Sequence, residues 1–163
     1  MGPLTNPASV EFQVTGCFDL GYARTASELL PRLGVSRSLT FTGQAGADEF
    51  VPGGRTLGFS SRAGRRASHR FQGTTYLTRA ERKGRLDPMP PAAAAQEAER
   101  LLNGAPGARR GSVLLTSGAA FWVAGWDRTL KEGVERAREL LEEGRALAKL
   151  RALQQLAAGR TWA

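Results

Sequence analysis

The sequence predicts an α/β fold: part of a mixed or parallel β-sheet flanked by helices, with three to four helices at the C-terminal end. Two patterns support this prediction. The first half of the chain alternates short β-favouring runs with a helical period, which is typical of β-α-β units. The second half is mostly helical in its pattern. With 163 residues, the chain is long enough for one domain with its own core.

The first β-α-β unit is predicted from three consecutive segments. Residues 12–18 are mostly apolar or β-favouring and predict a strand, and residues 37–42 predict a second one. Between them, residues 22–33 have a helical pattern that stops at Gly34. Pro31 lies inside that helix and predicts an early end or a kink. A connection of this length indicates a crossover, and hence some parallel sheet.

A hairpin and a further helix are expected in the middle of the chain. Residues 56–62 and 67–72 predict two short strands around Gly64. Residues 74–91 contain several prolines and charged residues, and we interpret them as a loop. Residues 92–102 then predict a helix that ends at an Asn-Gly pair.

The most apolar stretch of the chain runs from Ser112 to Gly125. Its uninterrupted apolar part is shorter than the roughly 18–20 residues needed to span a bilayer, so we expect a core element. Periodicity alone does not separate a buried helix from a buried strand at this length. The small residues at 117–120 would let another backbone pack very close to it.

Two helices are predicted after this stretch. Thr129 and Glu132 have the spacing of a capping box, and the helix that they begin stops at Gly144. A second helix follows and stops at Gly159. Apolar residues recur at helical spacing in both helices. They are Leu130, Val134, Ala137 and Leu141 in the first, and Ala146, Leu150, Leu153 and Ala157 in the second.

Composition narrows the class of protein. Cys17 is the only cysteine and His69 the only histidine, so the sequence contains no disulfide framework and no zinc-binding pattern. The first residues do not form a signal peptide, and we expect a cytoplasmic protein without a membrane partner. The net charge is +8, and residues 55–85 alone hold nine basic residues and one acidic residue. Such a segment suits nucleic acid, a phosphorylated substrate or an acidic partner, or it is simply a solvated surface.

A candidate metal site follows the second predicted strand. The loop Gly43-Gln-Ala-Gly-Ala-Asp48-Glu49 places adjacent carboxylates after a strand, and ligands bind at this end of strands in α/β sheets. Mg²⁺ prefers carboxylate oxygens and is often bound together with substrate phosphates. The pair therefore suits a hard cation, or it is simply a solvated part of the surface.

Five segments of the chain resemble the anthranilate phosphoribosyltransferase family. They are GPLTNPA at residues 2–8, VTGCFD at 14–19, LLPRLGV at 29–35, the predicted helix at 92–102 with its Asn-Gly end, and LLTSGAAFWVAGWDRTLKEGVERARELLEEGRALAKLRAL at 114–153. The resemblance implies that Asp48 and Glu49 bind the Mg²⁺ that accompanies phosphoribosyl pyrophosphate. It also implies that Gly2 and Pro3 belong to the wall of the anthranilate pocket. The chain departs from the family pattern at Thr42, where many members have histidine.

The resemblance implies a function and also a truncation. The family transfers the phosphoribosyl group of phosphoribosyl pyrophosphate to anthranilate, releasing pyrophosphate, in tryptophan biosynthesis, and full-length members are usually homodimers. Its GTGGD and KHGNR segments precede GPLTNP, and this sequence contains neither. Residues 1–163 are thus expected to be the C-terminal portion of a phosphoribosyltransferase α/β domain, without the N-terminal helical domain and the phosphate-binding half. We expect no catalytic side chain within this portion and no activity from it alone.

Two alternatives remain at this point. The first is a non-catalytic remnant or a nucleic-acid-binding module that uses residues 55–85. Nucleic acid is not favoured as a partner because Phe59, Phe71 and Tyr76 are the segment's only aromatic residues, which gives no stacking pattern. The second is a related enzyme that acts on nucleosides, such as a pyrimidine phosphorylase, and the GPLTNPA segment argues against it.

Overall fold

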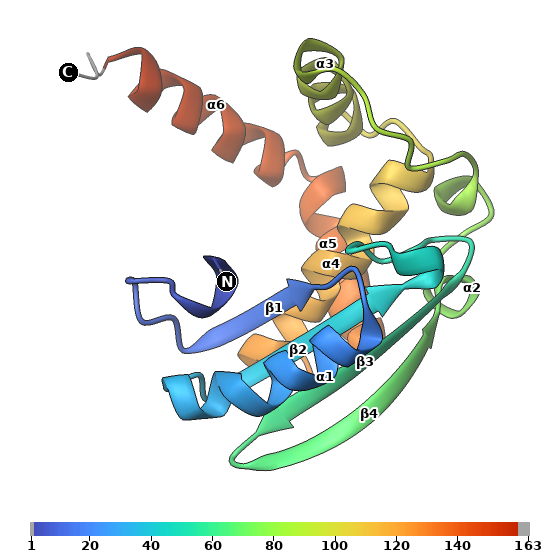
Figure 1. Cartoon of the computed structure of the whole chain (residues 1–163). Helices are drawn as coiled ribbons and strands as arrows, with labels where there is room; N and C mark the ends of the chain where they lie inside the picture. Colours follow the sequence, from blue (N-terminus) through green and yellow to red (C-terminus); the bar gives the residue numbers. More distant parts are fainter. Residues whose placement is uncertain (1, 160–163) are drawn as a thin grey trace.

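A computed structural model describes residues 2–159 as one four-stranded mixed sheet with helices on both of its faces (Figure 1). The strand order is β1-β2-β3-β4. Strand β1 (Phe12–Gly16) pairs parallel with β2 (Arg37–Gly43), whereas β3 (Arg55–Arg62) and β4 (Arg65–Gln72) form an antiparallel hairpin that pairs with β2. The predicted α/β class, the parallel pair and the hairpin are confirmed.

Helix α1 (Leu20–Leu29) connects the two parallel strands along one face of the sheet (Figure 1). Asp19 caps this helix, because its Oδ1 accepts a hydrogen bond from the Tyr22 N–H at 3.0 Å. The α-helix ends at Leu29, and a 3₁₀ turn, η2 (Leu30–Leu33), completes the connection. This is the early end that Pro31 predicted, since proline lacks the N–H that an α-helix interior needs.

Besides η2, four further short helical turns lie in the connecting segments of residues 2–159. They are η1 (Gly2–Leu4), η3 (Gln44–Gly46), α2 (Gly73–Tyr76) and η4 (Ala80–Arg82). Two of these turns overlap residues 74–91, so the interpretation of that segment as a plain loop was incomplete. It also contains a buried carboxylate, Glu81, whose partner is distant in sequence.

Four helices form the C-terminal half, as predicted. They are α3 (Pro91–Leu102), α4 (Ala108–Ala124), α5 (Leu130–Glu142) and α6 (Arg145–Ala158). The apolar stretch at residues 112–125, which periodicity could not assign to a helix or a strand, belongs to α4. This helix begins before that stretch, at Ala108. Helices α4 and α5 lie on the face of the sheet opposite α1 (Figure 1).

Strand β2 is buried on both faces, and its two faces differ in chemistry. Leu39 and Phe41 point into the apolar core formed with α4 and α5. Ser38 and Thr40 point to the other face, where the Thr40 hydroxyl donates a 2.6 Å hydrogen bond to the Ala23 carbonyl of α1. Because side chains alternate along a strand, this pattern fixes which face each later residue of β2 occupies.

Helix α6 confirms the predicted helix but not a buried apolar face. None of its residues is buried, and Leu153 and Leu156 are 57% and 65% exposed. Beyond its first turn beside α5, the helix extends away from the sheet (Figure 1). It also contacts α3, where Arg151 pairs with Glu99 at 2.9 Å. Among the described residues, no helix has the length and hydropathy required to cross a membrane.

Candidate active site

Two glycines bring the loop after β2 against the ends of the parallel strands. A Cβ atom added at Gly16 would lie 1.7 Å from the Asp48 carbonyl oxygen, and one added at Gly43 would lie 2.4 Å from the Glu49 carbonyl oxygen. The Gly43 N–H also donates a 2.7 Å hydrogen bond to the carbonyl of Ala47. Any side chain at Gly16 or Gly43 would therefore displace the backbone that carries the two carboxylates.

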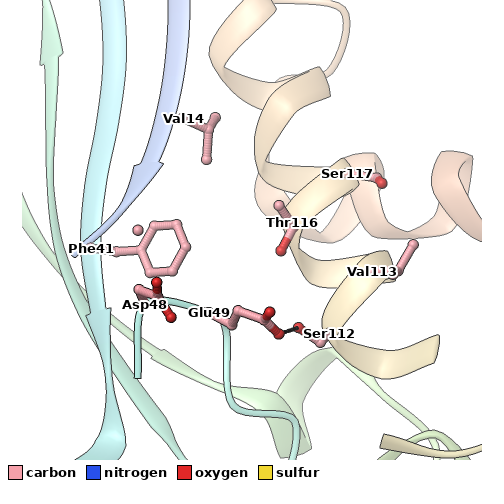
Figure 2. Close-up of a pocket in the computed structure, with 9 residues that line it drawn as sticks. Val14, Phe41, Asp48, Glu49, Ser112, Val113, Thr116 and Ser117 are labelled. Carbon is pink, nitrogen blue, oxygen red and sulfur yellow. Dashed lines mark hydrogen bonds between the residues drawn. The ribbon is translucent and has the colours of Figure 1, made fainter. Parts of the chain in front are cut away.

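A cavity of about 330 Å³ lies between these strand ends, the loop and the first half of α4 (Figure 2). Asp48 and Glu49, which the sequence predicted as a metal-binding pair, both line it. The Ser112 hydroxyl of α4 donates a 3.2 Å hydrogen bond to Glu49 Oε2 and so orients that carboxylate. The complete lining is Val14, Gly16, Phe41, Asp48, Glu49, Ser112, Val113, Thr116 and Ser117.

Helix α4 contributes polar residues that the sequence analysis did not identify. Ser112 and Thr116 are four residues apart and line the same cavity, across from Phe41 in Figure 2. Residues at i and i+4 share a helix face, so this spacing was a usable signal once the stretch is known to be helical. The helix itself was undecided from the sequence, and for that reason the pair was missed.

The side chains in the cavity could supply only some of the ligands of a metal ion, and a substrate would have to supply others. Among residues 2–159, no group of three or more histidine, cysteine, aspartate and glutamate side chains is placed to hold a metal. Two carboxylates remain, and proteins commonly hold Mg²⁺ with one or two carboxylates while water and substrate phosphates supply the other ligands. Metal binding by Asp48 and Glu49 therefore stays a prediction that requires a phosphate ligand.

Gly2 and Pro3 line a separate, larger groove of about 700 Å³ along the outer edge of β1. Gln13 holds the N-terminal turn there, because its Nε2 donates a 2.8 Å hydrogen bond to the Pro3 carbonyl. The groove and the carboxylate cavity share Val14 and Gly16, so they are neighbours along β1. The groove lining is Gly2, Pro3, Thr5, Asn6, Pro7, Val10, Phe12, Gln13, Val14, Thr15 and Gly16.

The lone histidine and the lone cysteine lie outside both concavities. His69 on β4 is hydrogen-bonded to the Ser60 hydroxyl at 2.7 Å and stacks on Phe71, and burial lowers the pKa of its imidazole. Cys17 is a free, buried thiol. Burial, followed by the charges of Asp19 and Asp48, raises the pKa of the Cys17 thiol.

The basic segment 55–85 is spread over the sheet and the chain that follows it. Arg66 pairs with Glu28 of α1 at 2.5 Å, and Arg85 pairs with Asp87 at 3.0 Å. The hypothesis of a nucleic-acid surface gains no support from this arrangement, because part of the charge is neutralised within the chain.

Comparison with known proteins defines the class of the protein. Residues 1–147 match the model of the glycosyl transferase family, a/b domain. The chain therefore belongs to this family. The fold described above agrees, since a mixed sheet covered by helices carries a cavity at the ends of its parallel strands.

Within that class, the similar proteins are anthranilate phosphoribosyltransferases, as the sequence resemblance predicted. The enzyme of Desulfotalea psychrophila is 37% identical over 151 residues, and that of Methanobrevibacter smithii is 33% identical over 150 residues. Each alignment covers 92% of this chain, but only 43% and 45% of the respective enzyme. The chain thus spans less than half the length of the curated relatives that it matches.

Solved structures show the same partial coverage. The crystal structure of the Thermus thermophilus enzyme has a TM-score of 0.79 and 37% identity, with 93% of this chain and 44% of that chain covered. The Saccharomyces cerevisiae enzyme in complex with PRPP and Mg has a TM-score of 0.76. At 20% identity, this second likeness concerns the fold alone, again over 92% of this chain and 44% of the other.

Proposed function

We propose that this chain supplies the metal-binding carboxylates and part of the substrate pocket of an anthranilate phosphoribosyltransferase. In this proposal, residues 1–163 are the C-terminal portion of the α/β domain of that enzyme. The observation that carries it is the position of Asp48 and Glu49, side by side in a cavity at the ends of two parallel strands. The similarity to anthranilate phosphoribosyltransferases, including a structure with PRPP and Mg, supports the choice of reaction.

The reaction requires two kinds of binding, and the chain offers a region for each. Transfer of the phosphoribosyl group to anthranilate releases pyrophosphate, and a bound Mg²⁺ would neutralise the charge that develops on this leaving group. Asp48 and Glu49 would hold the ion, and Ser112 would keep the Glu49 carboxylate oriented toward the cavity. The adjoining groove, with Gly2 and Pro3 in its wall, would hold anthranilate.

The arrangement of the two regions suits a two-substrate reaction. They meet at Val14 and Gly16, so ligands bound in each would approach one another along β1. Bringing the amine and the ribose carbon into line is itself a large contribution to such a rate. Because the chain spans less than half of its relatives, we propose that activity, and the homodimer of the full-length family, need the part of the enzyme that the chain does not cover.

The metal proposal is tested by titrating the chain with Mn²⁺, a paramagnetic substitute for Mg²⁺, and measuring free ion by electron paramagnetic resonance. We expect weak binding that tightens when phosphoribosyl pyrophosphate is present. Asp48→Asn and Glu49→Gln should each abolish this tightening, whereas Glu139→Gln should not, because Glu139 is an exposed carboxylate on α5. If all three variants lost the tightening of Mn²⁺ binding equally, the proposed site would be contradicted.

The activity proposal needs the remainder of the enzyme. The chain is mixed, or coexpressed, with a polypeptide that holds the uncovered part of the Thermus thermophilus enzyme, and phosphoribosylanthranilate is followed by fluorescence. We expect product from the mixture only, and none from the mixture that contains Asp48→Asn. Product from the chain alone would show that the expectation of inactivity is wrong.

A further inference from the structure

A second concavity lies on the opposite side of β2 from the carboxylate cavity. Thr40 faces α1, and Thr42, two residues further along, occupies the same face of the sheet. Thr42 is in register with Leu57, and Leu57 is in register with Arg70, so these three form one row across β2, β3 and β4. Helix α1 begins at Leu20, and Leu20 lines a cavity together with the three residues of this row.

This cavity has a volume of about 280 Å³. It has two arginines, one on each strand of the hairpin, together with two leucines and the loop that follows β2. The lining residues are Leu20, Thr42, Gly43, Gln44, Ala45, Arg55, Leu57 and Arg70. Phe41 faces the carboxylate cavity, so β2 separates the two concavities.

The cations of this cavity are not neutralised by the protein. Within residues 2–159, the side chains of Arg55 and Arg70 make no ion pair and donate no hydrogen bond, although Arg66 on the same hairpin pairs with Glu28. Both arginines are exposed, so water screens their charges, and their donors remain free for an anion that enters the cavity. Arginine is also the side chain whose planar donors best match phosphate oxygens.

A polar atom in the same cavity also has no partner. The Thr42 hydroxyl oxygen is buried and has no hydrogen-bond partner among the described residues. Leaving a buried hydroxyl unpaired is unfavourable, and a ligand oxygen would relieve that cost. Gln44 adds a further donor, because its Oε1 accepts the Arg55 N–H at 3.3 Å and its amide NH₂ remains able to donate.

We propose that this cavity binds the phosphate group of a small phosphorylated molecule. Arg55 and Arg70 supply the charge, Thr42 and Gln44 supply neutral donors, and Leu20 and Leu57 contact the organic part of the ligand. The site is independent of the proposed metal site, since it lies on the other face of the sheet and contains no carboxylate. It therefore needs no Mg²⁺ and does not depend on the proposed function.

The test is a titration of the full chain with inorganic phosphate, and separately with ribose 5-phosphate, in chloride buffer containing a chelator of divalent ions. Amide chemical shifts of residues that line the cavity report the site. We expect saturable shifts there, with the ribose 5-phosphate curve at lower concentration because Leu20 and Leu57 add contacts. Arg55→Gln and Arg70→Gln should each weaken phosphate binding by about tenfold, the value of one charge-assisted hydrogen bond.

Matched variants make the outcome decisive. Arg65→Gln changes an exposed arginine of the same hairpin outside this cavity and should leave phosphate binding unchanged. Thr42→Val preserves shape, removes the unpaired hydroxyl and should also weaken binding. The Asp48→Asn variant should bind phosphate as the unaltered chain does. Absence of saturable shifts at the cavity, or equal weakening by Arg65→Gln and Arg70→Gln, would overturn the proposal.

Discussion

Gly118 of α4 and Gly133 of α5 lie against each other with no room for a side chain on either. A Cβ atom added at Gly118 would lie 2.7 Å from the backbone nitrogen of Val134. One added at Gly133 would lie 2.3 Å from the carbonyl oxygen of Gly118. The two helices therefore touch through their backbones, which confirms the close approach that the small residues at 117–120 predicted. This contact positions α4, the helix that forms one wall of the carboxylate cavity.

The helix contact predicts a large effect from a single methyl group. Gly118→Ala should lower the free energy of unfolding by about 2 kcal/mol, because the added carbon must push α5 away. Urea denaturation followed by circular dichroism measures this change. Gly53→Ala is the matched control, since a Cβ there meets no atom closer than 4.0 Å. If the two variants were equally stable, the backbone contact would not be as tight as described.

The loop contact at Gly16 predicts a loss of ligand binding. Gly16→Ala places a methyl group onto the Asp48 carbonyl and should displace the loop that carries both carboxylates. We expect loss of the increase in Mn²⁺ affinity that phosphoribosyl pyrophosphate causes, together with a fall in stability. Gly53→Ala again serves as the control. Unchanged Mn²⁺ binding in a folded Gly16→Ala variant would contradict the role assigned to this glycine.

The buried ion pair between Glu81 and Arg138 predicts a stability effect in a segment outside the regular strands and long helices. Arg138 Nε and Nη2 contact the two Glu81 oxygens at 3.0 and 3.1 Å, and Arg138 also binds the Tyr76 carbonyl. Glu81→Gln should destabilise the protein by about 3 kcal/mol, because it leaves the partly buried Arg138 without its buried counter-charge. Glu135→Gln is the control: Glu135 binds the same arginine, but it is exposed, and its loss should cost less than about 1 kcal/mol.

The same pair predicts a pH dependence of defined sign. Burial raises the pKa of the Glu81 carboxyl, but hydrogen bonds from Arg138 and Thr78 and the charge of Arg138 outweigh it and lower the pKa overall. The ionised group therefore stabilises the fold above its unfolded pKa of about 4.3, and this contribution disappears as the pH falls through the lower, folded value. The stability difference between the unaltered chain and Glu81→Gln should thus shrink below about pH 4.3. A difference that stays constant to lower pH would contradict this assignment.

The local features of the fold follow from the sequence. Pro31 predicted an early end or a kink of α1, and the capping box of Thr129 and Glu132 predicted the start of α5. These signals act within one or two turns of the chain, so they need no knowledge of distant partners. The position of Asp48 and Glu49 at the ligand-binding end of the sheet was also predicted, because a loop that follows a strand lies at that end, and their binding of a metal stays a prediction.

What the sequence alone determined about this protein is its class, its order of elements, its family and its pair of candidate metal ligands. The tertiary structure decided that α4 is a helix whose hydroxyls face those carboxylates, that Glu81 finds Arg138, and that no apolar residue of α6 is buried. It also decided that Arg55 and Arg70 share one cavity. The physical reason is the sequence separation of the residues that interact. Caps and turns depend on neighbours in sequence, whereas these contacts depend on strand register and helix packing between residues far apart in the chain.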